Sequence, residues 1–120
     1  MSKLVSGFCA LIALVLLSTQ SMADDRNFVL VNETGYTLIF VGVNPPGDNN
    51  FNENELSGPL RHGGRLPVTF TGADRGCVWN IKVTWDDNSS SFFRGLNLCT
   101  INTVYLRYNR STDTASYVTD

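Results

Sequence analysis

An alternation of apolar and polar residues, with a period of two, is the feature that most constrains the fold of this chain. It is clearest over residues 77–85 (CVWNIKVTW), where Cys77 and every second residue after it through Trp85 are apolar. Because successive side chains of a β-strand point to opposite faces, this pattern predicts a half-buried strand with an aromatic inner face and Cys77 on the core side. The outer face of that strand is expected to hold Val78, Asn80, Lys82 and Thr84.

Similar short segments predict further strands along the chain, separated by turns about every ten residues. Asn32–Tyr36 and Asp86–Ser89 are rich in the Asn, Asp, Gly and Ser residues that favour turns. Pro67 has no backbone N–H and indicates an edge strand or the start of a strand. The expected fold is all-β: a small antiparallel β-sandwich, immunoglobulin-like, or an open barrel. The seven predicted strands are Asn27–Val31, Thr37–Val43, Arg65–Thr71, Cys77–Trp85, Ser90–Leu96, Thr103–Tyr108 and Ala115–Val118.

The first 23 residues have the pattern of an export signal. Lys3 precedes an uncharged run, residues 4–17, in which 12 of 14 residues are apolar. This run is shorter than the about 20 residues that a membrane-spanning helix needs, and Ser21-Met22-Ala23 fits the small-x-small rule for cleavage. An uncleaved anchor or an interfacial helix is the alternative. We expect cleavage after Ala23, which leaves a single β-sandwich domain of residues 24–120 in the periplasm or outside the cell, free of the membrane.

The cysteine count changes when the predicted signal is removed. Cys9 lies within the signal, so Cys77 and Cys99 remain. An even number of cysteines in an oxidising compartment predicts one structural disulfide. A reactive thiol pair or a metal site is disfavoured, because there is no Cys-x-x-Cys spacing and the single histidine, His62, is distant in sequence.

The charge of residues 24–120 gives no indication of a nucleic-acid partner. Eight basic residues stand against eleven acidic ones, which gives a net charge of −3. The arginines are scattered along the chain, whereas a nucleic-acid-binding face needs basic residues gathered together. The acidic balance therefore bears on solubility and not on the choice of partner.

One long segment, residues 44–64, breaks the alternation. It contains three prolines and four glycines in 21 residues. Loops of this length are uncommon in small domains and are often functional. Within the loop we expect residues 51–56 to form one short helical turn, with Phe51 and Leu56 tucked against the sandwich.

The same loop offers oxygen atoms of the kind that calcium binds. Asp48, Asn50 and Glu53 are the candidate ligands, but their spacing is not that of an EF-hand loop. We therefore expect no metal and no cofactor, and we keep an irregular calcium site as the minor alternative.

A series of short motifs runs in a fixed order through most of residues 24–120. The motifs are Val31–Gly35 (VNETG), Leu56–Gly58 (LSG), Gly64–Phe70, Cys77–Ile81 (CVWNI) and Leu98-Cys99. Their order resembles a family of small secreted proteobacterial β proteins of unknown function, whose members are sometimes labelled argininosuccinate lyase or Tat pathway signal protein. The lyase label is erroneous, because that enzyme is a large, mainly helical tetramer that 97 β-rich residues cannot build. The resemblance implies a secreted β domain and does not indicate which function it has.

Residue types used in catalysis are present, but no recognisable arrangement joins them. His62 is the single imidazole, and no Gly-x-Ser-x-Gly motif accompanies it, so we expect an exposed loop histidine. The carboxylate pairs Glu53/Glu55 and Asp86/Asp87 lie in polar turns, where solvent is expected to keep their pKa values ordinary. The chain is therefore predicted not to be an enzyme, and a small hydrolase is the least favoured alternative.

Aromatic residues are numerous enough to build either a core or a sugar-stacking face, and we assign them to the core. Phe92 and Phe93 are the exception, because neighbours on a strand face opposite sides and one of the two is then exposed. We place Phe93, with Arg94 beside it, on a candidate partner surface. The loop residues assigned to the same surface are Phe51, Asn52, Glu53 and Glu55.

These observations predict an exported, small, non-catalytic module that binds a ligand or an interaction partner. The expected partner is another periplasmic or extracellular protein. The alternative is a periplasmic enzyme inhibitor or immunity protein, since small β domains held by a disulfide make rigid plugs.

Overall fold

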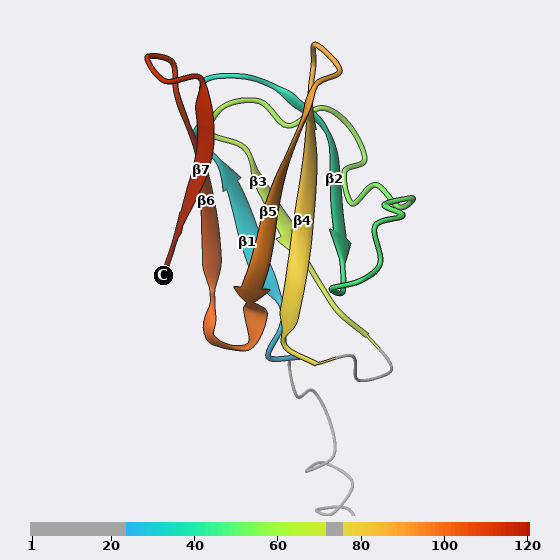
Figure 1. Cartoon of the computed structure of the whole chain (residues 1–120). Coiled ribbons are helices and arrows are strands. Elements are labelled where there is room, and N and C mark those ends of the chain that lie inside the picture. The colour runs from blue at the N-terminus through green and yellow to red at the C-terminus, as the bar shows by residue number, and fades with distance from the viewer. Residues whose placement is uncertain (1–23, 72–75) are drawn as a thin grey trace, which may run out of the picture.

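The structure, a computed structural model, describes residues 24–71 and 76–120, and within them the chain forms seven strands and one short 3-10 helix. The predicted all-β fold is confirmed, and each predicted strand corresponds to an observed one (Figure 1). The predicted signal peptide, residues 1–23, lies outside the described residues. The strands are β1 (Phe28–Asn32), β2 (Leu38–Asn44), β3 (Arg65–Val68), β4 (Val78–Trp85), β5 (Ser90–Asn97), β6 (Thr103–Asn109) and β7 (Thr114–Thr119), and the 3-10 helix is η1 (Leu98–Thr100).

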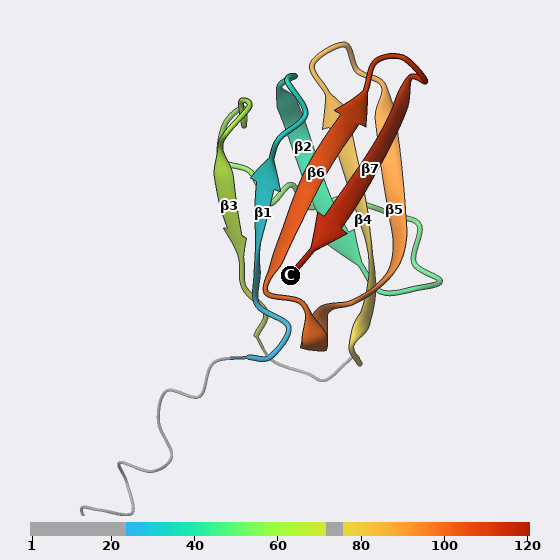
Figure 2. The ribbon, with the colours of Figure 1, turned by 90° about the vertical axis from the view of Figure 1, so that its left-hand side faces the viewer.

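The strands are arranged in two sheets that face each other. One sheet has the order β3-β1-β6-β7 and the other the order β2-β4-β5, as the turned view shows (Figure 2). Neighbouring strands are antiparallel except for β1 and β6, which run parallel, with Val29 opposite Thr103. Pro67 lies in β3 at the edge of its sheet, as its missing N–H requires.

Side chains from the two inner faces fill the space between the sheets. Trp79, Ile81, Val83 and Trp85 of β4 are buried, which confirms the inner face predicted from the alternation. The other buried apolar residues of the core are Phe28, Leu30, Leu38, Val41, Val68, Phe93, Leu96, Leu98, Val104 and Leu106. Residues from six of the seven strands contribute to this core, with Tyr117 of β7 packing against it.

Asn80 is the residue of β4 that departs from the predicted alternation. It was expected on the outer face, and the structure buries it. The pairing of β4 with β5 shifts between Trp79 and Ile81, and at this bulge the Asn80 side chain accepts a hydrogen bond from the N–H of Gly95 (2.9 Å). Gly95 adopts a φ of 73°, a conformation that residues with a Cβ rarely take. The bulge therefore ends the regular part of the β4–β5 ladder.

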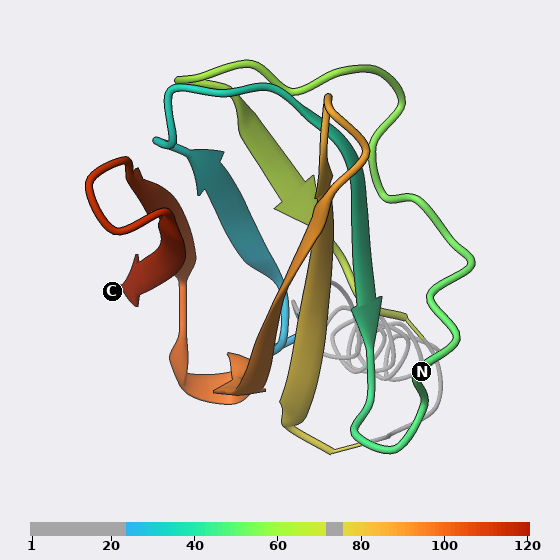
Figure 3. The same ribbon diagram turned by 45° about the horizontal axis from the view of Figure 1, so that its top comes forward.

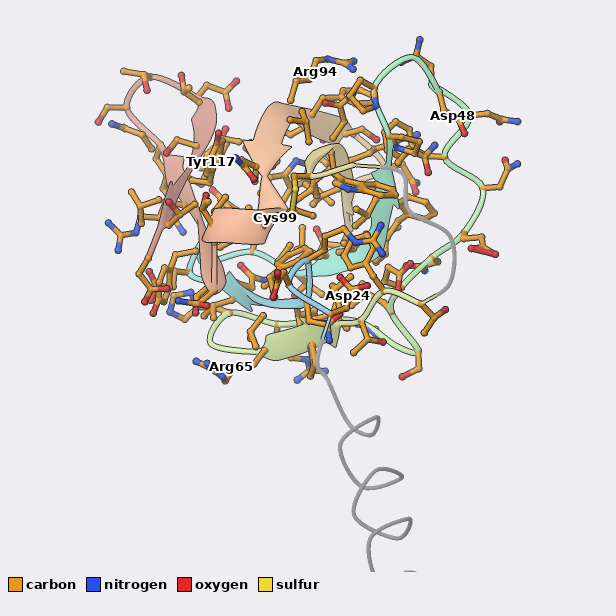
Figure 4. All side chains as sticks on the ribbon, turned by 90° about the horizontal axis from the view of Figure 1, so that it is seen from below. Asp24, Asp48, Arg65, Arg94, Cys99 and Tyr117 are labelled. Carbon is orange, nitrogen blue, oxygen red and sulfur yellow. A yellow bond between two sulfur atoms is a disulfide. The ribbon has the colours of Figure 1, made fainter. Side chains whose placement is uncertain are left out.

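The predicted disulfide is confirmed between Cys77 and Cys99, whose Cα atoms are 5.3 Å apart. It links the residue before β4 to η1, which follows β5, at the lower end of the molecule (Figure 4). Asn97 caps η1 by accepting a hydrogen bond from the Cys99 N–H (3.1 Å). The disulfide thus fixes the ends of two neighbouring strands to each other.

The segment Asn32–Tyr36 turns the chain from one sheet to the other. Asn32 is fully buried, and its side-chain nitrogen donates to the carbonyl oxygens of Tyr36 (2.8 Å) and Leu60 (2.9 Å). Its side-chain oxygen accepts hydrogen bonds from the N–H (3.0 Å) and the hydroxyl (2.6 Å) of Thr34. One side chain therefore joins the sheet-crossing turn to the end of the long loop.

The long loop after β2 contains no helical turn, so the expectation for residues 51–56 is wrong. The segment is extended and follows the edge of β2 (Figure 3). The Asn54 side chain accepts from the Val41 N–H (3.0 Å) and donates to the Ile39 carbonyl (3.1 Å), and the Glu55 N–H donates to the Val41 carbonyl (2.8 Å). Asn54 and Glu55 thus satisfy backbone groups of β2 that a neighbouring strand would otherwise bind. A segment coiled into a helical turn could not run along the strand in this way. Leu56 packs against the core as expected.

Candidate functional site

Aromatic and basic side chains gather on the outer face of the three-stranded sheet. Lys82 of β4 is paired with Gly42 of β2 on one side and with Phe92 of β5 on the other. Directly paired residues of antiparallel strands share a face, so these three positions form a row across the sheet. We use the name aromatic platform for Phe40, Phe51, Phe92, Lys82 and Arg94.

Cation–π and ring contacts connect the members of the aromatic platform. The Lys82 Nζ lies 5.7 Å from the ring centres of both Phe40 and Phe92. The Arg94 guanidinium carbon lies 4.9 Å from the Phe92 ring centre. Phe51, from the long loop, meets Phe92 edge to face with 5.9 Å between ring centres. Phe92 stands at the centre of these contacts and is still 45% exposed.

Gly42 leaves the space that the rings of the platform occupy. A Cβ at this position would lie 2.7 Å from Phe40 Cε1 and 3.0 Å from Phe51 Cδ1. The two rings therefore lie over the backbone of β2 where another residue would place its side chain. A glycine inside a strand often marks such a close approach.

The cations of the platform have no carboxylate partner in the part of the chain that the structure describes. The two ion pairs found there are Arg26 with Asp24 (2.7 Å) and Arg107 with Glu33 (3.1 Å). Arg94 points outward on the side of the molecule where the loop carrying Asp48 lies, away from Arg65 (Figure 4). Lys82 and Arg94 are thus positioned to meet anionic groups of a partner.

The structure corrects one residue of the predicted partner surface. Phe93 is buried, and its ring packs edge to face on Tyr117 of β7 with 5.6 Å between ring centres. Phe93 pairs with Ile81 on the inner face of the sheet, so its neighbour Phe92 is the exposed aromatic residue. Phe51 and Arg94 belong to the platform. Asn52, Glu53 and Glu55 are exposed in the adjoining loop.

Sequence reasoning missed Phe40, Gly42 and Lys82 as members of this surface. Phe40 lies in a nearly continuous apolar run, which hides the face to which each residue belongs. Gly42 in the middle of that run was the available indication, because a strand interior disfavours glycine unless something packs closely on it.

A hollow of about 510 Å³ lies between the long loop and the segment that follows β3. The three calcium candidates, Asp48, Asn50 and Glu53, all line it. Asp48 uses one carboxylate oxygen to accept from the Asn50 N–H (3.0 Å). Among the described residues, no three His, Cys, Asp or Glu side chains come close enough together to hold a metal ion. The three candidates therefore share one hollow, but Asp48 and Glu53 belong to no such cluster within the described residues.

Phe70 and Trp79 form the apolar wall of this hollow. Their rings meet at 64°, with centres 4.9 Å apart, and the Arg26 guanidinium carbon lies 4.9 Å from the Phe70 centre. Hydrogen bonds from Arg26 lower the pKa of Asp24 to about 2. The Asp24–Arg26 pair therefore holds the Arg26 guanidinium over the rings of Phe70 and Trp79, just before the start of β1.

Glu55 departs from the expectation of ordinary pKa values in the polar turns. Partial burial of its carboxyl group raises its pKa although the residue as a whole is exposed, and the neighbouring negative charge of Glu53 adds to the effect. Asp87 departs in the opposite direction, since hydrogen bonds from the side chain and backbone of Ser89 lower its pKa. Solvent alone therefore does not set the ionisation of these two carboxyl groups.

We expect Glu55→Gln to raise the stability of the domain at pH 7 and to leave it unchanged at pH 3. The folded pKa of Glu55 lies above the unfolded value, so the ionised form is disfavoured by folding. The resulting loss of folding stability is zero at pH values below the unfolded pKa and reaches its full size at pH values above the folded pKa. Urea midpoints at the two pH values measure it, with the exposed Asp25→Asn as the control. A midpoint at pH 7 that does not rise contradicts the prediction.

A second hollow, of about 500 Å³, lies at the opposite end of the sandwich. Tyr36, Trp85 and Tyr108 line it, with ring centres 5.2 to 6.3 Å apart and every pair edge to face. Trp85 is buried and donates from Nε1 to the Ser91 hydroxyl (3.0 Å), while Arg110 lies 5.2 Å from the Tyr36 ring centre. Trp85 belongs to the core, whereas Tyr36 is 38% exposed at the rim of the hollow. Because the three rings meet edge to face, they do not present a flat sugar-stacking face.

His62 is exposed, as expected, and holds two loops together. Its Nδ1 accepts a hydrogen bond from the N–H of Gly35 (3.0 Å). Within the described residues, neither ion pair involves His62. The Nδ1 atom is therefore occupied by a backbone donor, and no carboxylate of the described residues forms an ion pair with the ring, as the orienting group of a general base would.

Comparison with known proteins shows a similarity of fold. No protein-family model and no curated protein matches the chain. A solved structure, described as the NMR structure of the protein from Eubacterium rectale, matches with a TM-score of 0.50 and 13% sequence identity. The match covers 78% of this chain and 85% of that chain. Among the described residues, no helix is long and apolar enough to cross a membrane.

Proposed function

We propose that this protein is an exported, non-catalytic module that binds another periplasmic or extracellular protein through the aromatic platform. One observation carries the proposal: Phe92 is 45% exposed, between two cations without a carboxylate partner in the described part of the chain. Exposed aromatic and arginine side chains that lie together are characteristic of binding hot spots. Four of the five platform residues lie in the strands of one sheet, which limits the backbone entropy lost on binding.

Two features support the exported location. The first is the predicted signal with cleavage after Ala23. The second is the Cys77–Cys99 disulfide, since disulfides persist in oxidising compartments and are rare in the cytosol. Mass spectrometry of the periplasmic product is expected to find a chain that begins at Asp24 and carries no free thiol. A product that retains residues 1–23 contradicts the proposed processing.

We expect Phe92→Ser to reduce partner capture by more than about tenfold while lowering the free energy of unfolding by about 1 kcal/mol, which leaves the domain folded. The substitution removes the exposed ring that both cations and Phe51 contact. The full chain is expressed with its own signal in a bacterial host, and the exported product is used to capture proteins from periplasmic extract and culture medium. Quantitative mass spectrometry compares the proteins bound by the original and variant proteins.

Val118→Ser is the matched control for this experiment. Val118 is an apolar residue of β7 in the other sheet and is 42% exposed, nearly the same as Phe92. We expect this variant to capture the same partner as the original protein. Recovery of no specific partner, or equal capture by Phe92→Ser, overturns the proposal. Capture of an enzyme whose activity falls on binding identifies the protein as an inhibitor or immunity protein.

A further inference from the structure

We infer that the partner presents an extended peptide segment, which adds to the free edge of β5 as a further strand and places an acidic side chain near Lys82 and Arg94. This inference rests on the proposed function and adds to it the chemistry of the partner and the way in which its backbone binds. Strand addition of this kind uses main-chain hydrogen bonds for affinity and alternate side chains for specificity.

The edges of the two sheets differ in how well they are covered. Asn54 and Glu55 hydrogen-bond to the edge of β2, and Leu60 forms a bridge with Leu38 next to it. β3 has four residues and includes Pro67, which cannot donate from its backbone. Both edges are therefore poor templates for an added strand.

The edge of β5 is long and uncovered in the described structure. β5 has eight residues and is paired with β4 on one side only. In an antiparallel pair, every second residue of a strand directs its backbone N–H and C=O to the neighbouring strand. The Trp85 N–H donates to the Ser89 carbonyl (2.8 Å), so Ser89 and every second residue after it direct these groups to β4. The backbone groups of Ser90, Phe92 and Arg94 therefore face away from β4. The bulge at Gly95 ends this regular stretch.

The side chains of this edge indicate the composition of the added strand. Phe92 and Arg94 are two residues apart in β5, so they lie on the same face of the sheet. Lys82 lies beside Phe92 on the neighbouring strand β4. Cross-strand neighbours interact directly, which favours an apolar residue opposite Phe92. An aspartate or glutamate opposite Arg94 would supply the carboxylate that the described residues do not provide.

β7 is also an edge strand, but its surroundings differ. It has six residues, and its exposed positions are mostly small polar side chains, with Val118 as the exposed apolar residue. Arg107 of the neighbouring β6 is already paired with Glu33 (3.1 Å). Charge complementarity therefore favours β5 over β7 as the docking edge.

The test uses a library of short random peptides displayed on phage, panned against the exported, disulfide-bonded protein. Enriched sequences are expected to alternate and to combine an apolar residue with an acidic residue two positions away. Hydrogen exchange of the complex is expected to slow at the backbone amides of Ser90, Phe92 and Arg94. Arg94→Gln is expected to weaken binding of the selected peptide, and Val118→Ser to leave it unchanged.

Two peptide analogues separate backbone from side-chain recognition. Methylation of alternate backbone nitrogens that face β5 is expected to weaken binding by roughly tenfold or more, because those donors are lost. Replacement of the acidic residue by its amide is expected to weaken binding by a smaller factor and to reduce its salt dependence.

Several results overturn strand addition. They are an absence of enriched peptides, equal binding of the methylated peptide, protection at β7 or in the long loop, and a dimer of this chain formed through β5 without peptide. If Phe92→Ser abolishes partner capture while methylation of the peptide backbone has no effect, strand addition is overturned and binding through the aromatic platform is still supported. If no partner depends on Phe92, the proposed function fails as well.

Discussion

Replacing Cys77 and Cys99 with serine is expected to lower the free energy of unfolding by about 3 kcal/mol. The two cysteines are 22 positions apart in the sequence, and the disulfide restricts the unfolded chain over that interval. Such a loss is a large share of the 5–15 kcal/mol, roughly, that stabilises a typical domain. The melting temperature is expected to fall by on the order of 15 °C. Urea titration followed by the fluorescence of the buried Trp79 and Trp85 measures the change.

Reduction provides the control for the double serine variant. A thiol reductant is expected to bring the original protein close to the stability of the variant and to leave the variant itself unaffected. Because Cys77 and Cys99 are both only partly buried, the reductant has access to the bond. Equal urea midpoints for the original protein with and without reductant would contradict the assigned role of the disulfide.

Asn32→Ala is expected to destabilise the domain by about 3 kcal/mol, because it removes four hydrogen bonds of a buried side chain and leaves the buried Thr34 N–H without its acceptor. Asn32 makes four side-chain hydrogen bonds, to Thr34, Tyr36 and Leu60, and is fully buried. Asn102→Ala is the matched control, since Asn102 is exposed, and its effect is expected to stay within about 0.5 kcal/mol. Urea titration of both variants at pH 7 makes the comparison.

Asn32→Asp tests the direction of the same hydrogen bonds. The carboxylate can still accept from Thr34, but it presents an oxygen where the Asn32 nitrogen donates to the carbonyls of Tyr36 and Leu60. Repulsion between these oxygens is expected to make this variant at least as unstable as Asn32→Ala at pH 7. It should recover part of its stability as the pH falls and the carboxyl group becomes protonated. A loss below about 1 kcal/mol for Asn32→Ala would show that the surrounding groups find other partners.

The strands and the core were predictable from the sequence because side-chain alternation is a local property. Residues 77–85 show which side chains of β4 face the core without any knowledge of the neighbouring strands. The disulfide was predictable for a different reason, since two cysteines remain once Cys9 is placed in the predicted export signal.

The surface proposed for binding was harder to predict because it depends on strand order. Phe40, Lys82 and Phe92 come from three strands, and nothing in their spacing indicates that β4 lies between β2 and β5. The choice between Phe92 and Phe93 depended on the register of the β4–β5 hairpin, which Asn88 helps to set with a φ of 72°. The burial of Asn80 similarly followed from a bulge, where one extra residue in a strand shifts the alternation of side chains between the two faces of the sheet.

The parallel pairing of β1 with β6 has a consequence for when the domain can fold. Val29 and its partner Thr103 are separated by 74 positions, so the central pair of the four-stranded sheet joins the two ends of the domain. Contacts so distant in sequence slow folding, because a large loop closes before they form. A chain threaded through a membrane from its N-terminus could pair β1 with β3 early, but β1 would lack β6 until nearly the whole domain had crossed. Late closure of this kind would suit the proposed export, because a chain that has not yet folded can pass through a narrow channel.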